Sequence, residues 1–133
     1  MTLPVKEDDR CPPKPPKTCD ALFAKYVNAG DLDSLVDLYE PAATLVSAPE
    51  PMAVGHEAIR AALGGLLAAK TQLKINVTHT IVSGDIAATY NEWRGTISPG
   101  GQKREPRGKT IEICHRQPDG AWRFAIDDPY ARG

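Results

Sequence analysis

The chain has 133 residues, which is enough for one domain of ordinary size and too few for two independent hydrophobic cores. Hydrophobic residues make up 41% and charged residues 25%, a balance that excludes wholesale disorder. The 16 Lys and Arg against 17 Asp and Glu give a formal net charge of −1, which argues against a dedicated nucleic-acid-binding protein. No apolar run approaches the roughly 20 residues of a membrane span, and the first residues lack the features of a signal peptide. We therefore expect a soluble, cytoplasmic protein.

Residue types that bind metals are few and scattered. The chain holds three cysteines and three histidines: Cys11, Cys19, Cys114, His56, His79 and His115. They form neither a Cys-x-x-Cys pair nor a His-Glu-x-x-His motif, so we predict no metal site. We interpret the cysteines as free thiols, because Cys11 and Cys19 could pair only in an oxidising compartment. No Gly-rich phosphate loop follows a predicted strand, and we expect no cofactor.

Residues 1–17 differ in composition from the rest of the chain, because they hold five of its 12 prolines. Proline cannot continue a helix or donate to a strand ladder, so we predict a disordered tail with polyproline II character. A single domain over residues 18–130 follows it.

Helical signals come first in this domain. The predicted helices span residues 18–30, 31–41 and 55–70, with a short strand over residues 43–46. Thr18 is a suitable N-cap for the first helix, Gly30 is a suitable C-terminal stop, and Asp31 is a suitable N-cap for the second helix. Leu63 lies on the apolar stripe of the third helix.

After residue 70 the apolar period changes from 3.6 to 2. The segments rich in β-branched and aromatic residues are 74–82, 86–97, 109–116 and 121–127. Tight turns and one longer charged loop, over residues 98–108, separate them. Helices segregated from an antiparallel sheet define an α+β fold.

The last two predicted strands each place apolar and ionisable residues on opposite sides. In one interpretation the apolar side packs on the helices and the carboxylates face water, which the strand pattern alone favours. In the other, the helices cover the ionisable side and enclose a cavity, while the apolar side packs on a second subunit.

Several motifs follow one another in a recognisable order. They are Asn-Ala-Gly-Asp-Leu-Asp-Ser-Leu-Val-Asp-Leu-Tyr at 28–39, Ala-Thr-Leu at 43–45, Gly-x-Glu-Ala-Ile-Arg at 55–60 and Asp-Gly-Ala-Trp-Arg-Phe at 119–124. Together they resemble the SnoaL-like and ketosteroid-isomerase-like branch of the nuclear transport factor 2-like superfamily, over about residues 18–130. The resemblance implies a cystatin-like cone, in which a curved antiparallel sheet wraps around three N-terminal helices and leaves a pocket at its open end. It favours the cavity interpretation of the strands.

Steroid isomerases of this branch move a proton with an aspartate, while a tyrosine and a neutral aspartic acid hydrogen-bond the dienolate oxygen. The resemblance puts Phe23 at the place of the tyrosine, Ser47 at the place of the base and Glu112 at the place of the neutral acid. Phe23 cannot donate a hydrogen bond, and a lone serine is not a general base near pH 7. Steroid isomerisation by that mechanism is therefore disfavoured.

The same registration divides the strand residues between two faces. It turns toward the pocket Ala88, Tyr90, Glu92, Glu112, Cys114, Ala125 and Asp127. It turns toward the convex face Trp93, Ile111, Ile113, Trp122 and Phe124. An apolar patch of this size predicts a two-fold homodimer. Phe23, Ser47 and Leu63 complete the predicted substrate-binding set.

Glu112 and Asp127 are the predicted catalytic residues. Carboxyls that share an apolar pocket raise one another's pKa, which suits proton transfer next to a carbonyl. The alternative is structural ion pairing with Arg94, Arg116 or Arg123.

Tyr90 and Glu92 are the residues that we expect to orient a substrate, although Tyr90 suits a core position equally well. The basic run over residues 103–109 has the composition of a phosphate-binding or localisation segment, but its place in a hairpin loop favours a solvated turn.

Two functions remain open from the sequence. The first is a cofactor-independent isomerase or lyase that moves a proton on a small, mostly apolar carbonyl compound. The second is a non-catalytic module that binds a small molecule or mediates dimeric protein association. The fold hosts both. Neither involves nucleic acid or a membrane.

Overall fold

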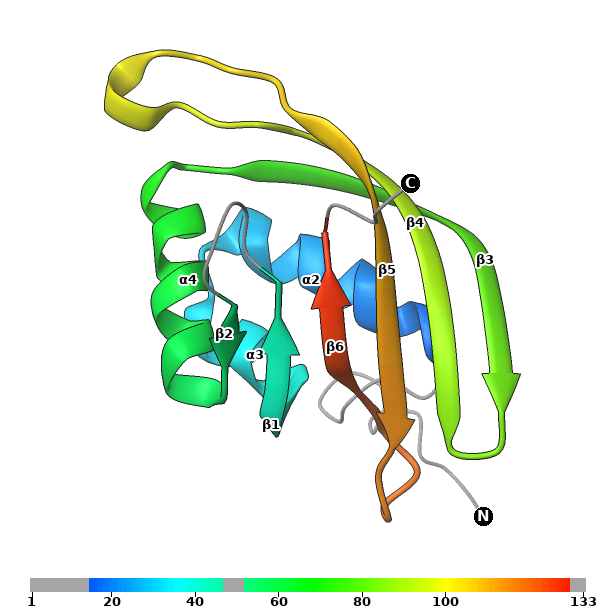
Figure 1. Ribbon diagram of the computed structural model, residues 1–133. Helices are drawn as coiled ribbons and strands as arrows, with labels where there is room; N and C mark the ends of the chain where they lie inside the picture. The colour runs from blue at the N-terminus through cyan, green and yellow to red at the C-terminus, as the bar shows by residue number, and fades with distance from the viewer. Residues whose placement is uncertain (1–14, 47–51, 130–133) are drawn as a thin grey trace, which may run out of the picture.

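The computed structural model describes residues 15–46 and 52–129 and shows one α+β unit (Figure 1). Its elements are α2 (Lys17–Ala29), α3 (Leu32–Asp37), β1 (Tyr39–Leu45), β2 (Ala53–Val54), α4 (His56–Ala68), β3 (Gln72–Ser83), β4 (Ile86–Thr96), a 3₁₀ turn η1 (Pro99–Gly101), β5 (Arg107–Arg116) and β6 (Trp122–Asp128). The predicted fold class is confirmed. The predicted tail lies almost wholly outside the described residues.

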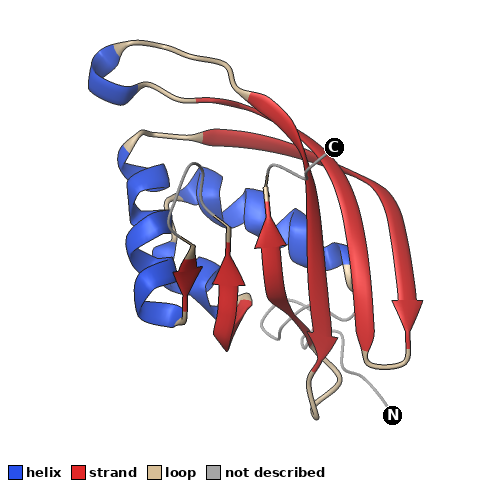
Figure 2. Ribbon diagram, in the orientation of Figure 1, coloured by secondary structure: helices blue, strands red, loops and turns tan. Residues whose placement is uncertain are grey.

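The strands form a single curved sheet that wraps around the helices (Figures 1 and 2). Their order is β2-β1-β6-β5-β4-β3, and each neighbouring pair is antiparallel except β1 and β6, which run parallel. The sheet therefore has an inner face toward the helices and an outer face away from them.

The corner between the first two helices follows its sequence signals. Gly30 adopts a left-handed conformation with φ 72° and ends α2. The Asp31 side chain then accepts a hydrogen bond of 3.2 Å from the Ser34 backbone N–H and caps α3. The predicted cap at Thr18 was wrong, since α2 begins at Lys17 after Pro16, without a side-chain cap.

The largest boundary error concerns the second helix. It ends at Asp37, four residues before the predicted end, and β1 begins at Tyr39. Tyr39 is wholly buried and pairs with Phe124 of β6, so burial in the sheet outweighs the helical pattern of this segment. The two-residue strand β2 was not predicted.

An irregularity in β6 decides which residues face inward. Ile113 of β5 lies opposite Ile126, whereas the next residue, Cys114, lies opposite Phe124. Ala125 is therefore the extra residue of a β-bulge. Because the bulge interrupts the alternation of side chains, both Phe124 and Asp127 are buried on the inner face although they are three residues apart.

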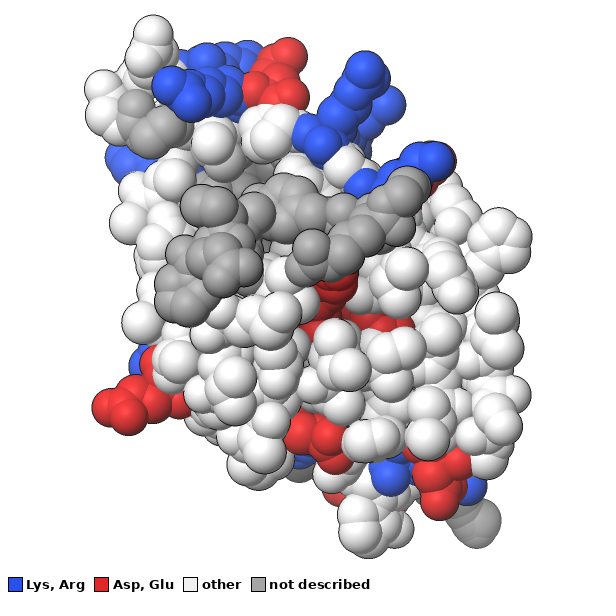
Figure 3. Space-filling model, viewed as in Figure 1, with Lys and Arg blue, Asp and Glu red and all other residues white. Residues whose placement is uncertain are grey.

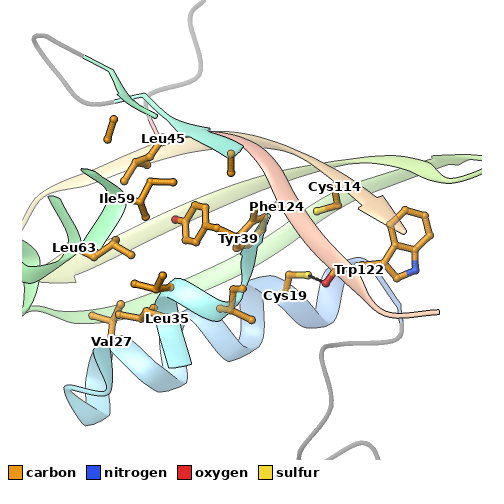
Figure 4. Packing of buried hydrophobic residues seen from close by; sticks show 14 of the residues in the cluster. Cys19, Val27, Leu35, Tyr39, Leu45, Ile59, Leu63, Cys114, Trp122 and Phe124 are labelled. Atoms are coloured by element: carbon orange, nitrogen blue, oxygen red, sulfur yellow. Dashed lines mark hydrogen bonds between the residues drawn. The ribbon is translucent and has the colours of Figure 1, made fainter. Parts of the chain in front are cut away.

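The hydrophobic core lies between the inner face and the helices (Figure 4). Tyr39 packs on Phe124 with ring centroids 5.1 Å apart, and Leu35 and Ile59 are completely buried. Cys19 and Cys114 are buried free thiols, and the Cys19 thiol donates to the Trp122 carbonyl at 3.4 Å. Cys11 lies outside the described residues.

The outer face is largely apolar. Ile81, Ala88, Ile113 and Ile126 form one row across β3, β4, β5 and β6, because each lies directly opposite the next. Ile81 and Ile126 are 58% and 45% exposed. Figure 3 shows that the face over β5 and β6 is mostly uncharged.

The predicted composition of this face needs correction. Ile111 and Ile113 lie on it, as expected, but Trp93, Trp122 and Phe124 do not. Trp122 and Phe124 are buried in the core, and Trp93 contributes to an internal cavity. The physical reason is that these rings supply the bulk that fills the space between the sheet and the helices.

Candidate functional site

A cavity of about 380 Å³ opens between the inner face of the sheet and the helices. Its walls are mainly apolar and come from α2, α4 and the sheet: Phe23, Ala62, Leu63, Leu66, Leu73, Ile75, Trp93 and Phe124. Thr71, Ile97, Pro106 and Pro129 also line it, so it extends to the end of the sheet where the β4–β5 hairpin begins. Trp93 is held in place because its indole N–H donates to the Pro129 carbonyl at 3.0 Å.

Three carboxyl groups line this cavity, each from a different element. Asp20 comes from the first turn of α2, Glu112 from the middle of β5, and Asp127 from β6 after the bulge. They are 1%, 5% and 5% exposed, respectively. Acidic side chains are seldom buried this deeply without a cation, which makes the cluster the most unusual feature of the described structure.

Glu112 is the most fully hydrogen-bonded of the three. Its Oε1 accepts from the Thr89 hydroxyl at 2.7 Å and from the Asn91 amide at 2.6 Å. Its Oε2 accepts from the Thr110 hydroxyl at 2.7 Å. All three donors come from β4 and β5, so Glu112 is fixed to the sheet.

Asp20 is only partly satisfied. Its Oδ1 accepts from the Asn91 amide at 3.0 Å, whereas its Oδ2 and the Asn91 Oδ1 are buried without a hydrogen-bond partner. Burial is the main cause that raises the Asp20 pKa to about 11, and the neighbouring Glu112 carboxylate adds to it. Asp20 is therefore a neutral acid at physiological pH, with an O–H group available as a donor.

Asp127 lies in a different electrostatic setting. Tyr39 donates its hydroxyl to Asp127 Oδ2 at 2.5 Å, a bond that favours the ionised carboxylate. Burial and the charge of Glu112 outweigh it and raise the Asp127 pKa to about 8. Asp127 can therefore both accept and return a proton near neutral pH, and Oδ1 is the oxygen left for a ligand.

The three arginines considered as ion-pair partners lie elsewhere. Arg116 pairs with Asp85 at 2.6 Å, the Arg123 guanidinium donates to the Asp37 carbonyl, and Arg94 is exposed. No Lys, Arg or His is among the described residues that line the cavity. The structural ion-pair interpretation of Glu112 and Asp127 is therefore wrong.

The predicted substrate-binding residues divide into three groups. Phe23 and Leu63 line the cavity. Tyr90 and Glu92 were assigned to the wrong side of β4: both are exposed, whereas Thr89 and Asn91 are buried. The third group is Ser47, which lies outside the described residues.

Three further residues that were predicted to face the pocket do not line the cavity. Ala88 lies in the outer row with Ile113, and Ala125 is the bulged residue, so neither lines the cavity. Cys114 does lie on the inner side, but within the core rather than at the cavity.

Asp20 was missed as a site residue, because a carboxylate in the first turn of a helix has a sufficient explanation in the helix dipole. One signal could have revealed it. Asp20, Phe23 and Val27 have the i, i+3, i+7 spacing of one helix face, and the other two residues are apolar. An acid on an apolar stripe indicates a buried carboxyl.

Among the described residues, no group of three or more His, Cys, Asp or Glu side chains is arranged to hold a metal ion. No helix in the described ranges is long and apolar enough to cross a membrane.

The fold and the cavity define a class of protein, a curved α+β cone with an acidic internal site. The sequence profile of the SnoaL-like domain matches residues 20–129, and the chain belongs to this family. Comparison with curated proteins gives no match.

Solved structures share this fold at low sequence identity. A ketosteroid isomerase-like protein from Erwinia carotovora atroseptica has a TM-score of 0.77 at 14% identity, with 85% of this chain and 90% of that chain covered. A nuclear transport factor 2-like protein with a cystatin-like fold from Novosphingobium aromaticivorans has a TM-score of 0.72 at 18% identity, with 84% and 75% covered. A candidate scytalone dehydratase from the same organism has a TM-score of 0.73 at 16% identity, with 84% and 78% covered.

Proposed function

We propose that the protein is a cofactor-independent enzyme that moves a proton on a small, mostly apolar carbonyl compound, in an isomerisation or a dehydration. The observation that carries this proposal is the convergence of Asp20, Glu112 and Asp127 in one apolar cavity without a basic residue among its described lining. Carboxyls that ionise at different pH values are the equipment of acid–base catalysis. The similarity to a candidate scytalone dehydratase agrees with this class of reaction.

The three carboxyls take different roles in the proposed mechanism. Asp127, as the carboxylate, removes a proton from the carbon next to the substrate carbonyl. Asp20, as the neutral acid, donates a hydrogen bond to the carbonyl oxygen, which becomes an enolate oxygen. Glu112 is held in place by three hydrogen bonds, and its closeness raises the pKa of both neighbours.

The second step decides the product. In an isomerisation, the substrate carries a double bond next to the deprotonated carbon, and the protonated Asp127 returns its proton to the far carbon of the resulting dienolate, which moves the double bond into conjugation with the carbonyl. In a dehydration, the enolate electrons reform the carbonyl and expel a hydroxyl from the next carbon, and the proton held by Asp127 leaves with it as water. Both routes restore the Asp127 carboxylate and need no external oxidant or reductant.

Steroid isomerisation by the three-residue set of the related isomerases remains disfavoured. Phe23 lines the cavity, where it supplies an apolar wall and no hydrogen-bond donor. In the proposed mechanism Asp20 supplies the donor instead, from the same helix and one turn earlier.

The test is proton exchange on a simple ketone in D₂O, for example 2-octanone, followed by NMR. We expect the wild-type protein to accelerate deuterium incorporation next to the carbonyl, and Asp127→Asn to reduce it by roughly 10²- to 10⁴-fold. Glu92→Gln is the matched control, because it also removes a carboxylate but from the exposed outer face. Equal exchange by wild type and Asp127→Asn contradicts the proposal. Binding of the ketone without exchange would favour the non-catalytic module.

We also propose that the outer face joins two copies of the chain in a two-fold homodimer. The support is the uncharged row of Ile81, Ala88, Ile113 and Ile126, whose two end residues are half exposed. Such a row can pack on a copy of itself about a two-fold axis, and burial would remove the apolar patch from water.

A further inference from the structure

The acidic cavity holds carboxyl oxygens to which the described residues supply no hydrogen-bond donor. Both oxygens of Glu112 are satisfied by side chains of the sheet. Asp20 is 1% exposed, yet its Oδ2 has no hydrogen-bond partner. Among the described residues, Asp127 accepts a hydrogen bond only from Tyr39, through Oδ2, which leaves Oδ1 open. One oxygen from α2 and one from β6 therefore remain for a ligand.

Both of these oxygens belong to the cavity wall. Asp20 and Asp127 line the cavity, whereas Asn91 does not. The Asp20 Oδ1 accepts from the Asn91 amide at 3.0 Å, so Oδ2 is the oxygen on the side of the cavity. When the two carboxyls are ionised, their oxygens only accept hydrogen bonds, and a ligand group that satisfies them must be a donor.

The cavity also lacks a positive charge of its own. No Lys, Arg or His is among its described lining residues. In the protein alone, protons relieve the crowding of the acids, because burial raises the pKa of Asp20 to about 11 and that of Asp127 to about 8. A cationic ligand relieves it in another way, since a positive charge nearby lowers both pKa values and replaces a bound proton.

The remaining lining decides which kind of cation fits. The described acidic residues are not arranged to hold a metal ion, and the cavity walls are mainly apolar. A hard metal ion needs about six oxygen ligands. A primary alkylammonium ion has three N–H donors instead, and its apolar tail gains from burial. Trp93 and Phe23 line the same cavity, and the faces of aromatic rings attract cations.

We propose that the acidic cavity binds a primary ammonium ion with an apolar tail, whose N–H groups donate to Asp20 Oδ2 and Asp127 Oδ1. The charge lies between α2 and β6, and the tail packs on the apolar wall that includes Phe23, Leu63 and Trp93. This ligand class goes beyond the proposed reaction, because its binding needs no chemistry in the cavity. Such an amine occupies the space of the carbonyl substrate and is a competitive inhibitor of the proposed reaction.

The experiment compares three ligands with the same tail, hexylammonium, hexyltrimethylammonium and 1-hexanol, by titration calorimetry at pH 8. At this pH roughly half of Asp127 is ionised in the free protein, and an alkylammonium group keeps its charge. We expect hexylammonium to bind at least about tenfold more tightly than the other two, since 1-hexanol lacks the charge and hexyltrimethylammonium lacks the N–H donors. Asp20→Asn and Asp127→Asn should each remove most of this preference.

Asp37→Asn and Glu92→Gln are the matched controls, because each removes an exposed carboxylate outside the cavity and should leave the preference unchanged. Equal affinity for hexylammonium and either of the other ligands overturns the proposal. So does an equal loss in the control variants, which would indicate diffuse attraction.

The outcome for this site is separate from that for the proposed function. If 2-octanone exchanges its protons in the presence of the protein but hexylammonium does not bind, the ammonium site fails and the proposed function stands. If hexylammonium binds with the expected preference but the protein exchanges no protons of 2-octanone, the ammonium site stands and the proposed function fails.

Discussion

Replacing Asp20 by Asn tests the electrostatics of the cavity without any knowledge of the substrate. The side chain is 1% exposed, and its pKa is raised from 3.8 to about 11. Over the pH range between these values the unfolded chain releases the proton of Asp20, whereas the folded chain retains it. Asp20 therefore contributes its full stabilisation of the folded state below about pH 4. The free energy of unfolding falls as the pH rises toward 11.

The expected size follows from proton linkage. One proton taken up on folding changes the free energy of unfolding by about 1.4 kcal/mol per pH unit. Asn at position 20 cannot ionise, so Asp20→Asn lacks this dependence. Between pH 5 and pH 7 the stability of the variant relative to wild type should increase by about 3 kcal/mol. Asp127 contributes equally to both proteins, and its own shift is not caused by Asp20.

The measurement is urea denaturation of both proteins at several pH values, with the difference in unfolding free energy plotted against pH. Asp37→Asn is the control, because the Asp37 side chain is exposed at the end of α3, and its difference from wild type should stay flat. A flat difference for Asp20→Asn as well would refute the assignment of Asp20 as a buried neutral acid, and with it the proposed hydrogen-bond donor.

Four further predictions concern other parts of the molecule. If proton exchange is detected, kcat/KM should rise with pH up to about 8, where Asp127 ionises. Glu112→Gln should shift this rise to lower pH by roughly one unit or more, because it removes the charge that raises the Asp127 pKa. An unchanged pH profile in the variant contradicts that cause. Ile126→Glu should convert a dimer to monomers in sedimentation velocity, whereas Val82→Glu, at an equally exposed site opposite inward-facing Ala87, should not. Gly108→Ala should alter Trp93 fluorescence and weaken ketone binding, because a Cβ at position 108 would lie 3.0 Å from the Trp93 indole nitrogen. Gly65→Ala is the control: a Cβ there meets open space, so the substitution should only stabilise α4, by about 1 kcal/mol. Leu63→Ala should lower the free energy of unfolding by about 2–5 kcal/mol in thermal or urea denaturation, and a loss below 1 kcal/mol would show that the cavity wall is not packed as described.

The sequence was most informative where one signal dominates. Gly30 and Asp31 mark the helix corner through backbone conformation and capping, which are local effects. The strand period in β5 correctly put Glu112 and Ile113 on opposite faces, because each face of that strand is uniform in character, but it favoured Glu112 toward water. The family resemblance placed Glu112 inside.

The errors arise where polarity and burial diverge. The inward side of β4 carries Thr89 and Asn91, whose hydrogen bonds with Glu112 allow polar groups to be buried. Its outward side carries Tyr90, which is typical of a core or a pocket wall. The registration taken from the family resemblance turned Tyr90 and Glu92 inward instead. The partners that settle it lie on β5 and α2, at sequence distances that a strand pattern does not reveal.

The bulge at Ala125 makes the position of a cavity carboxylate depend on the number of residues in β6. A strand of strict alternation could not bring both Phe124 and Asp127 to the inner face, so without the extra residue one of them would lie on the outer face. Loss of that residue could move a proton-transferring carboxylate from the interior to the surface on which two subunits are proposed to meet. A relative could thus gain or lose its reaction, and alter its assembly, through a single-residue insertion or deletion in β6 with every side chain type preserved. When sequences of relatives are compared, the bulged residue of β6 should therefore be aligned first, and the acidic residues of the cavity afterwards.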